Sequence, residues 1–449
     1  MSAVGTKRLL SIASVALLVS ALAGCGTNSV LSARVSKASN KLTQLPKGHV
    51  TVTLGVPPTS NDVAIADAIA KAFEKLHHNI TVKVVQTTVV NSTESELAAA
   101  AAGTLPDIIR TADVHVQYQA SHGMLMNLQP YMNAYGYKDS QFNEAILKLG
   151  QYNGDQYVIP RGFDQIVVEY NPQLFKKFHV PLPKMGWTWQ TFLKDCKLLT
   201  RKVGNTQYYA VGDSLTDTEW AIWVPFIEGL GGHIFSPNGK QAEMDSPATV
   251  KAMSEFMSFA KNYTSWFANL PSDPFESGHA AMDFIVHGQL PGQVNASATK
   301  WIFSFDPNFV NFPLLPHPAI GSGMAGYAVT TDAKGAQAQA SAALMMFLLS
   351  KQGEEAVSSI DGSVPIRKDL AHSSFWQNYP RVGYKLNTQA FVAYDQYDIT
   401  APNDNIANPG PMNTDINNAF EAMSLGKSSV SQAMQTLNAQ MNALLAQGQ

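Results

Sequence analysis

Polar side chains follow two of the strands that the sequence predicts. Ser60 and Asn61 come after a strand that begins at Val50, and Asp113 follows a short strand that begins near Asp107. Hydroxyl, amide and carboxylate groups bind the hydroxyls of a small polar solute by hydrogen bonds. Open α/β sheets bind ligands beyond the carboxyl ends of their strands, so we expect Ser60, Asn61 and Asp113 at a ligand site.

Patterns typical of catalysis or of metal binding are missing from the sequence. A glycoside hydrolase needs two carboxylates on either side of the bond that it cleaves, and no motif here pairs two acids. His77 and His78 are adjacent and point apart, and His279 and His287 lie on either side of a turn, so neither pair predicts a metal centre. No Gly-rich phosphate loop occurs. We predict no catalytic residues, metal or cofactor, and keep a secreted glycoside-active enzyme as an alternative of another class.

The first residues are typical of an export signal. A basic pair at residues 7–8 precedes an uncharged, Leu- and Ala-rich run over residues 9–22, which is too short to span a bilayer comfortably. The Leu-Ala-Gly-Cys sequence that ends at Cys25 resembles the bacterial lipobox, in which the cysteine receives a lipid and becomes the mature N-terminus. The resemblance predicts a signal peptide over residues 1–24, lipid attachment at Cys25 on the extracytoplasmic face of a membrane, and a flexible tether over residues 25–48.

The composition is that of a globular chain stabilised by its core. Hydrophobic residues make up 45% of the 449 residues, and the formal net charge is −3 with no basic run after the export signal, which argues against nucleic-acid binding. Cys196 is the only cysteine besides Cys25, so no intramolecular disulfide is available once Cys25 is acylated. Cys196 shares the apolar face of a predicted helix with Phe192 and Leu199, and we expect an inert core thiol.

Strands and helices alternate after the tether. Residues 50–56 alternate as in a strand, and residues 62–76 have the apolar spacing of an amphipathic helix. This order, which continues to a third strand, predicts an α/β fold with a parallel sheet covered by helices. The further predicted elements are strands over 80–85, 107–109, 157–160 and 165–170, and helices that begin at 93 or span 188–199, 247–262, 336–350 and 429–445. The Phe- and Pro-rich stretch 303–318 is interpreted as a segment that crosses between lobes.

Short motifs occur in a fixed order from residue 50 to about residue 445. They resemble those of family 1 of the bacterial extracellular solute-binding proteins, the maltose-binding-protein-like lipoproteins of ABC sugar importers. The segments that carry the resemblance are Gly103–Ile108, Gly123–Leu128, Tyr152–Pro160, Val168–Phe175, Pro183–Phe192, Phe275–Met282, Gly326–Val329 and Gly362–Ile366.

The resemblance implies a two-lobe, periplasmic-binding-protein-like (type II) fold, with hinge-connected lobes that close over a ligand cleft. The expected N-terminal lobe comprises residues 50–159 and 315–366, and the C-terminal lobe residues 161–314 and 367–449. The implied function is that of a monomeric substrate-binding component that delivers a mono- or oligosaccharide to the transmembrane subunits of an ABC permease. Glycerol-phosphate or another small polar solute is the alternative ligand. Arginine would suit a phosphate, but only Arg161 and Arg367 lie near the crossings, which favours a neutral sugar.

The resemblance also adds candidate ligand contacts. Phe163 and Asp164 lie just past the first expected crossing, and Gly323 and Met324 lie near the second. Glu169, in the strand predicted over 165–170, is expected on the surface of its lobe.

Two further segments correspond to ligand loops of the relatives. Trp220 and Trp223 lie where relatives often place a stacking aromatic, although their spacing of three is also that of a packed helix. His287 and Gln289 occupy a loop that reads Gly-Pro-Trp in relatives. Because the loop departs from the family pattern, the resemblance does not identify the ligand. Trp301 is expected in the core.

Overall fold

The computed structural model describes residues 41–447, except 91–92, 215–221, 269, 271, 296–299, 374–375, 377–386 and 402–409. The predicted signal peptide, Cys25 and Trp220 lie outside the described residues. In the described part, no helix is both long and apolar enough to cross a membrane.

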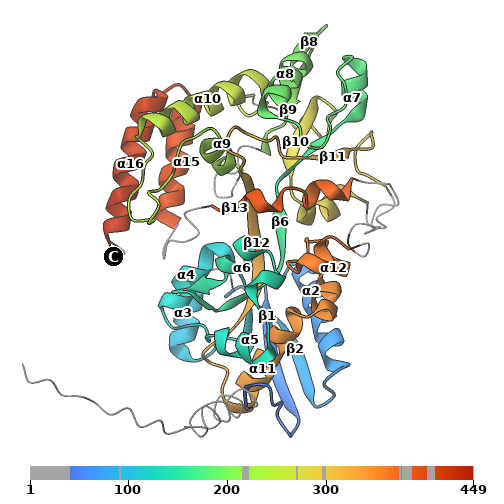
Figure 1. Ribbon diagram of the computed structural model, residues 1–449, viewed down its shortest axis with the longest axis vertical. Coiled ribbons are helices and arrows are strands. Elements are labelled where there is room, and N and C mark those ends of the chain that lie inside the picture. The colour runs from blue at the N-terminus through green and yellow to red at the C-terminus, as the bar shows by residue number, and fades with distance from the viewer. Residues whose placement is uncertain are drawn as a thin grey trace, which may run out of the picture.

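The chain forms two α/β lobes, one above the other in Figure 1, which confirms the predicted fold class. In the first lobe, β1 (Val50–Val56) pairs in parallel with β2 (Ile80–Gln86) and β3 (Ile108–Ala112), as predicted. The sheet is nevertheless mixed, because β12 (Ile320–Val329) is antiparallel to β3. The carboxyl ends of β1 and β3 therefore meet at one sheet edge, next to the strands that lead to the other lobe.

Long strands connect the lobes. β6 (Val158–Gln165) is antiparallel to β12 from Val158 to Gln165 and continues through Ile166 into β7 (Val167–Tyr170) of the second lobe. The strand predicted over 157–160 is thus the first half of β6. The strand predicted over 165–170 corresponds to the end of β6 and to β7. A third connection, β13 (Asp398–Ile399), pairs in parallel with the start of β12.

The second lobe has its own sheet in the order β11-β7-β10-β9-β8. β10 (Ala280–Ile285) lies between β7, to which it is antiparallel, and β9 (Thr206–Val211), to which it is parallel. The edge strands are β8 (Arg201–Val203) and β11 (Asn308–Asn311). β11 lies within the stretch interpreted above as a crossing segment, so that interpretation is wrong for these four residues. The crossing follows it, in β12.

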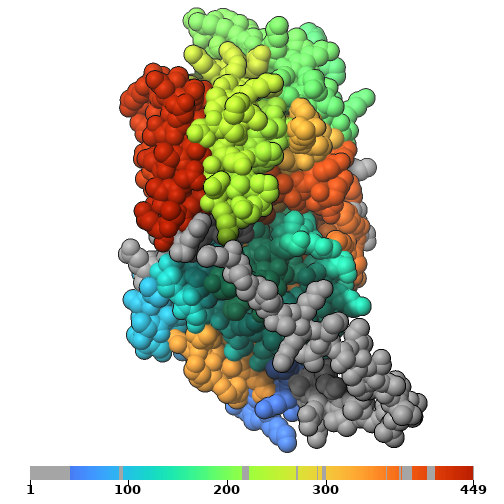
Figure 2. Space-filling model, turned by 60° about the vertical axis from the view of Figure 1, so that its left-hand side comes forward, coloured from blue at the N-terminus to red at the C-terminus, as the bar shows by residue number. Residues whose placement is uncertain are grey.

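Helices cover both sheets, and α15 and α16 stand beside α10 in the second lobe (Figures 1 and 2). The helices around the first sheet are α2 (Ser60–Glu74), α3 (Thr93–Ala102), α4 (Asp113–Ser121), α5 (Gln129–Tyr135), α6 (Glu144–Leu149), α11 (Gly335–Leu348) and α12 (Lys351–Asp361). The others are α7 (Pro172–Lys177), α8 (Trp189–Leu199), α9 (Val224–Gly229), α10 (Pro247–Tyr263), α13 (Lys368–Ala371), α15 (Gly410–Ser424) and α16 (Val430–Gln447).

The apolar core consists of two clusters, and the first of them also includes residues of the second sheet, such as Val167, Ile285 and Phe309. Cys196 is fully buried in the second cluster, and burial raises the pKa of its thiol well above the ordinary value, as expected for an inert core cysteine. Trp301 is buried in the first cluster, as predicted. The clusters do not coincide with the predicted lobes, and Leu315 and Trp376 are two examples. Leu315 packs in the second cluster, and Trp376 packs in the first.

Candidate functional site

A hollow of about 240 Å³ lies where β6 leaves the first lobe and β10 ends. We call it the Asp164 hollow. Asp164 and Gln289 supply its polar groups, and both are predicted ligand contacts. Its other lining residues are Ile166, Ile222, Phe284, Ile285 and Val286. This combination of an apolar wall and a few polar groups is typical of sites that bind small molecules.

Asp164 is held in place by backbone groups on two sides. It pairs in register with Gly323 of β12, and its Oδ1 accepts a hydrogen bond of 2.9 Å from the N–H of Gly288. A Cβ atom at position 288 would lie 2.9 Å from Asp164 Oδ2, so glycine is required for this approach. The half-buried carboxylate therefore has a fixed orientation at the edge of the hollow.

Gln289 belongs to a short 3₁₀ helix, η3 (His287–Gln293), that follows β10. Its Oε1 accepts a hydrogen bond of 3.1 Å from the N–H of Val286. The exposed side-chain amide keeps its NH₂ group without a partner among the described residues. The hollow thus offers an acceptor from Asp164 and a donor from Gln289, which together suit the hydroxyls of a neutral solute.

A buried ion pair lies at the amino end of α2, and no pattern in the sequence predicts it. Asp62 Oδ1 lies 2.8 Å from Arg161 Nη1 and 3.6 Å from Arg110 Nε. Burial raises the pKa of Asp62, but the hydrogen bond and charge of Arg161, with smaller contributions from Thr59 and Arg110, outweigh it, so the net pKa is lowered. Asp62 is ionised at neutral pH and connects α2 to the crossing strand β6.

Ser60 and Asn61 are the first residues of α2, and both are exposed beside this ion pair. Thr59 caps the helix by accepting a hydrogen bond of 3.1 Å from the N–H of Asp62. Neither Ser60 nor Asn61 lines the Asp164 hollow. Their role in ligand binding stays a prediction.

Three other predicted residues contact one another instead of the hollow. Asp113, the first residue of α4, is buried and accepts a hydrogen bond of 2.8 Å from the N–H of Met324. Met324 pairs in register with Phe163, whose side chain is only 2% exposed. Burial raises the pKa of Asp113. This group connects α4 to the crossing strands.

Two predicted aromatic contacts are buried among other rings. Trp223 is 2% exposed, and its ring lies 5.3 Å from that of Phe420. His287 is also buried, with its ring 4.8 Å from those of Trp376 and Phe391.

Glu169, which is expected on a lobe surface, is 1% exposed, so that expectation is wrong. The reason is that β7 is a central strand, with β10 on one side and β11 on the other.

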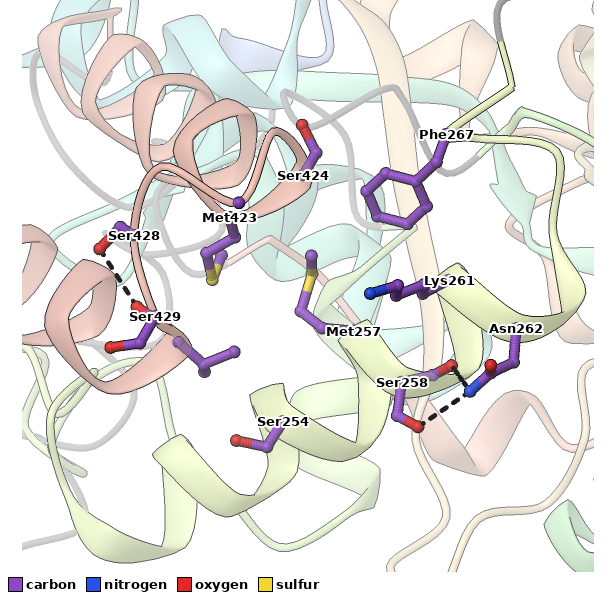
Figure 3. A pocket seen from close by; sticks show the side chains of 12 residues that line it. Ser254, Met257, Ser258, Lys261, Asn262, Phe267, Met423, Ser424, Ser428 and Ser429 are labelled. Atoms are coloured by element: carbon purple, nitrogen blue, oxygen red, sulfur yellow. Dashed lines mark hydrogen bonds between the residues drawn. The ribbon is translucent and has the colours of Figure 1, made fainter.

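Two other hollows lie elsewhere. One of about 540 Å³ opens between α6 and α9 next to β13 and is lined by Lys148, Glu228 and Asp398, among others. Sequence reasoning missed it because its residues come from three distant segments. Another, of about 480 Å³, lies on the second lobe between α10 and the α15–α16 turn (Figure 3), with Met257, Met423 and Phe267 among its lining residues. That hollow is far from the strand ends at which α/β sheets bind ligands.

Residues 68–383 match the family described as bacterial extracellular solute-binding protein. The match covers well over half of the chain. It includes every strand of the second sheet and every residue of the Asp164 hollow.

Solved structures of sugar-binding proteins have a similar fold. An ABC substrate-binding protein from Listeria monocytogenes in complex with cycloalternan is 20% identical, with a TM-score of 0.72 over 89% of this chain and 99% of that one. The cyclic α-maltosyl-1,6-maltose binding protein from Arthrobacter globiformis is 18% identical, with a TM-score of 0.72 over 89% and 100%. The GacH receptor of Streptomyces glaucescens, solved unliganded and with acarbose, is 19% identical, with a TM-score of 0.67 over 89% and 100%. At these identities the likeness establishes the fold.

Proposed function

We propose that this chain, which belongs to the bacterial extracellular solute-binding proteins, binds a carbohydrate in the Asp164 hollow and delivers it to an ABC importer. The observation that carries the proposal is the position of Asp164. Its carboxylate is fixed by Gly288 at the crossing between the lobes, beside an apolar wall. Closure of the lobes around a ligand at this point would let both lobes contribute contacts.

The chemistry of the hollow favours a sugar. A sugar ring has hydroxyls along its edge and an apolar C–H face. Hydrogen bonds to a charged group such as Asp164 contribute about 1.5–3 kcal/mol each, and the wall that includes Ile166 and Phe284 suits the C–H face. The structurally similar proteins were solved with oligosaccharides such as cycloalternan and acarbose, which supports the same ligand class. Trp220, outside the described residues, stays a predicted stacking partner.

A phosphate ester such as glycerol-phosphate is a poorer fit. The carboxylate of Asp164 would repel an anion. Arg161 is paired with Asp62, and Arg367 donates hydrogen bonds to Asp369 and to the carbonyl of Leu349. Both arginines near the crossings are therefore engaged within the protein, and a neutral ligand is favoured.

Hydrolysis of a glycoside is also a poorer fit than binding. The described lining of the Asp164 hollow contains one carboxylate, whereas most glycoside hydrolases use two. Both the family and the similar structures are of binding proteins. We therefore propose a binding component without enzymatic activity.

The family is extracellular, and the chain accordingly acts outside the cytoplasm. We further propose that Cys25 carries a lipid that holds a monomeric protein at the membrane, close to the transmembrane subunits of its permease. The lipobox resemblance supports this anchor. Metabolic labelling with a radioactive fatty acid tests it, because Cys25→Ala should abolish incorporation.

A ligand panel tests the function. Maltose, maltotriose, mannobiose, acarbose and glycerol-3-phosphate are each added to the purified protein, and the melting temperature is measured. A ligand at 100 times its Kd adds about 2.7 kcal/mol to the free energy of unfolding. We expect at least one sugar to raise the melting temperature. A rise with the phosphate ester and with none of the sugars would contradict the proposal.

A further inference from the structure

Three aspartates meet on the second lobe, outside the Asp164 hollow. Asp213 follows β9, Asp283 lies in β10, and Asp273 lies in a turn that precedes β10. One carboxylate oxygen from each lies within 4.8 Å of the oxygens from the other two. The three side chains come from separate parts of the chain, so the fold brings them together.

The surroundings of these aspartates are also acidic. Glu276 lies three residues after Asp273, and its backbone N–H donates a hydrogen bond of 3.0 Å to Asp273 Oδ1. Among the described residues, none of these four acids forms an ion pair with Lys, Arg or His. The cluster therefore brings four acidic side chains together without an ion pair in the described part of the chain.

A second observation points to a bound cation. Glu169 is directly opposite Asp283 in the antiparallel pairing of β7 and β10, so both side chains lie on the same face of the sheet. Its Oε2 accepts a hydrogen bond of 2.9 Å from Gln293, but its buried Oε1 has no hydrogen-bond partner among the described residues. Gln293 Oε1 is likewise buried and unpartnered in the described part of the chain. Buried polar atoms are rarely left unsatisfied, and a cation bound beside Asp283 would satisfy the Glu169 oxygen.

Two of the three aspartates use only one carboxylate oxygen for hydrogen bonds. Asp273 Oδ1 accepts hydrogen bonds from the N–H groups of Phe275 and Glu276, at 2.7 and 3.0 Å. Asp283 Oδ1 accepts from Ser214 Oγ and from the N–H of Phe284. In both carboxylates Oδ2 makes no hydrogen bond among the described residues.

A glycine makes room for one of these carboxylates. A Cβ atom at position 212 would lie 2.5 Å from Asp283 Oδ2, so only glycine allows the carboxylate to occupy this position.

We propose that Asp213, Asp273 and Asp283 bind a hard divalent cation of the calcium class, with Glu169 as the next carboxylate. The donors are all oxygens, which suit Ca²⁺ and Mg²⁺ better than metals that prefer imidazole or thiolate. Calcium takes oxygen ligands at about 2.3–2.6 Å, so two of its ligands are at most about 5 Å apart, and the three carboxylate oxygens lie within 4.8 Å of one another. Magnesium demands near-ideal octahedral geometry and usually keeps several waters, so calcium suits an all-protein carboxylate cluster better.

A cation at this position would tie the turn at Asp273 to β9 and β10. Asp283 directly precedes Phe284 and Ile285, which line the Asp164 hollow. The cation would therefore fix one wall of that hollow. The proposal does not depend on which solute the hollow binds.

The test uses the full chain, stripped of metal with EDTA and dialysed. We expect equilibrium dialysis to find one Ca²⁺ per chain. Extracellular calcium modules have Kd values of about 10⁻⁴–10⁻³ M, so 10 mM CaCl₂ should raise the melting temperature by about 1–3 °C, and 10 mM MgCl₂ by less. These measurements need no sugar, so failure of the calcium proposal leaves the sugar proposal untouched.

Variants distinguish the site from general salt effects. Asp273→Asn should abolish the calcium-dependent shift, and its metal-free form should melt no lower than the metal-free parent because repulsion is relieved. Asp245→Asn, an exposed aspartate of the same lobe, should keep the full shift. Glu169→Gln should weaken calcium binding at least tenfold while the protein still folds. Absence of stoichiometric binding by the parent protein, or an equal shift in Asp273→Asn and the parent, would overturn the proposal.

Discussion

The carboxylate of Asp164 accepts a hydrogen bond of 2.9 Å from the backbone N–H of Gly288. This bond joins the strand that crosses between the lobes to the turn that follows β10. Asp164 also lines a hollow with an apolar wall. The proposed sugar site depends on this arrangement.

Replacing the carboxylate should weaken sugar binding. Asp164→Asn keeps the size of the side chain but removes its charge. A charged hydrogen bond contributes about 1.5–3 kcal/mol, so we expect affinity to fall by about 10- to 150-fold in isothermal titration calorimetry. The control is Asp306→Asn, which changes an exposed aspartate outside the hollow. Equal affinities of Asp164→Asn and the control would show that Asp164 does not contact the ligand.

A methyl group at position 288 should have a similar effect. In Gly288→Ala the new Cβ would lie 2.9 Å from Asp164 Oδ2, so the carboxylate must move. We expect sugar affinity to fall at least fivefold. Gly292→Ala is a matched control in the same short helix, because a Cβ there meets nothing within 4 Å. The sugar affinity of Gly292→Ala should be unchanged. An equal loss of affinity in Gly288→Ala and Gly292→Ala would mean that the substitutions disturb the helix as a whole and not the Asp164 carboxylate.

The ion pair between Asp62 and Arg161 should stabilise the fold. Arg161→Met leaves Asp62 buried with only Arg110 nearby, at 3.6 Å. Breaking a buried pair costs about 3–5 kcal/mol, so we expect the free energy of unfolding in urea to fall by about 2–4 kcal/mol. The double variant Asp62→Asn, Arg161→Met should lose less than the single one. Lys368→Met, which removes an exposed pair with Glu144, should change stability by less than about 1 kcal/mol.

Stability should decrease as the pH rises from about 4 to 7. Burial raises the pKa values of Asp283 and Asp398 to about 7, from 3.8. In this range the folded state binds more protons than the unfolded state, so the free energy of unfolding falls with rising pH. With EDTA present, we expect a higher melting temperature at pH 5 than at pH 8. Asp398→Asn should reduce that difference, and an unchanged difference would contradict the assignment.

Asp62 has the opposite dependence, in a different range. Its pKa is lowered from 3.8 in the folded state, so its contribution to stability is present at neutral pH and is lost on acidification below about 4. Arg161→Met should therefore be less sensitive than the parent to acid below pH 4.

The order of secondary structure could be predicted well from the sequence. The helix predicted over residues 62–76 is α2 (Ser60–Glu74), because its apolar spacing reflects one buried face. The edge strand β11 could not be predicted, because four residues among Phe and Pro show no clear alternation. Pairings between distant strands, such as β12 with β3, leave no local pattern.

The site could be predicted only in part. Phe163 and Asp164 are neighbours on β6, and side chains alternate along a strand, so both could not face the same hollow. Both are predicted ligand contacts, and the structure brings only Asp164 to the hollow. The cluster of Asp213, Asp273 and Asp283 leaves no signal in the sequence, because its members are far apart along the chain and only the fold brings them together.

Direct measurement of sugar binding tests the central proposal. Isothermal titration calorimetry of the purified protein with maltotriose, cycloalternan and mannobiose should find at least one ligand that binds one per chain, with a Kd in the micromolar range. Asp164→Asn should bind that ligand at least tenfold more weakly. If none of a broad panel of sugars binds, or if the variant binds as tightly as the parent, the Asp164 hollow is not the sugar site.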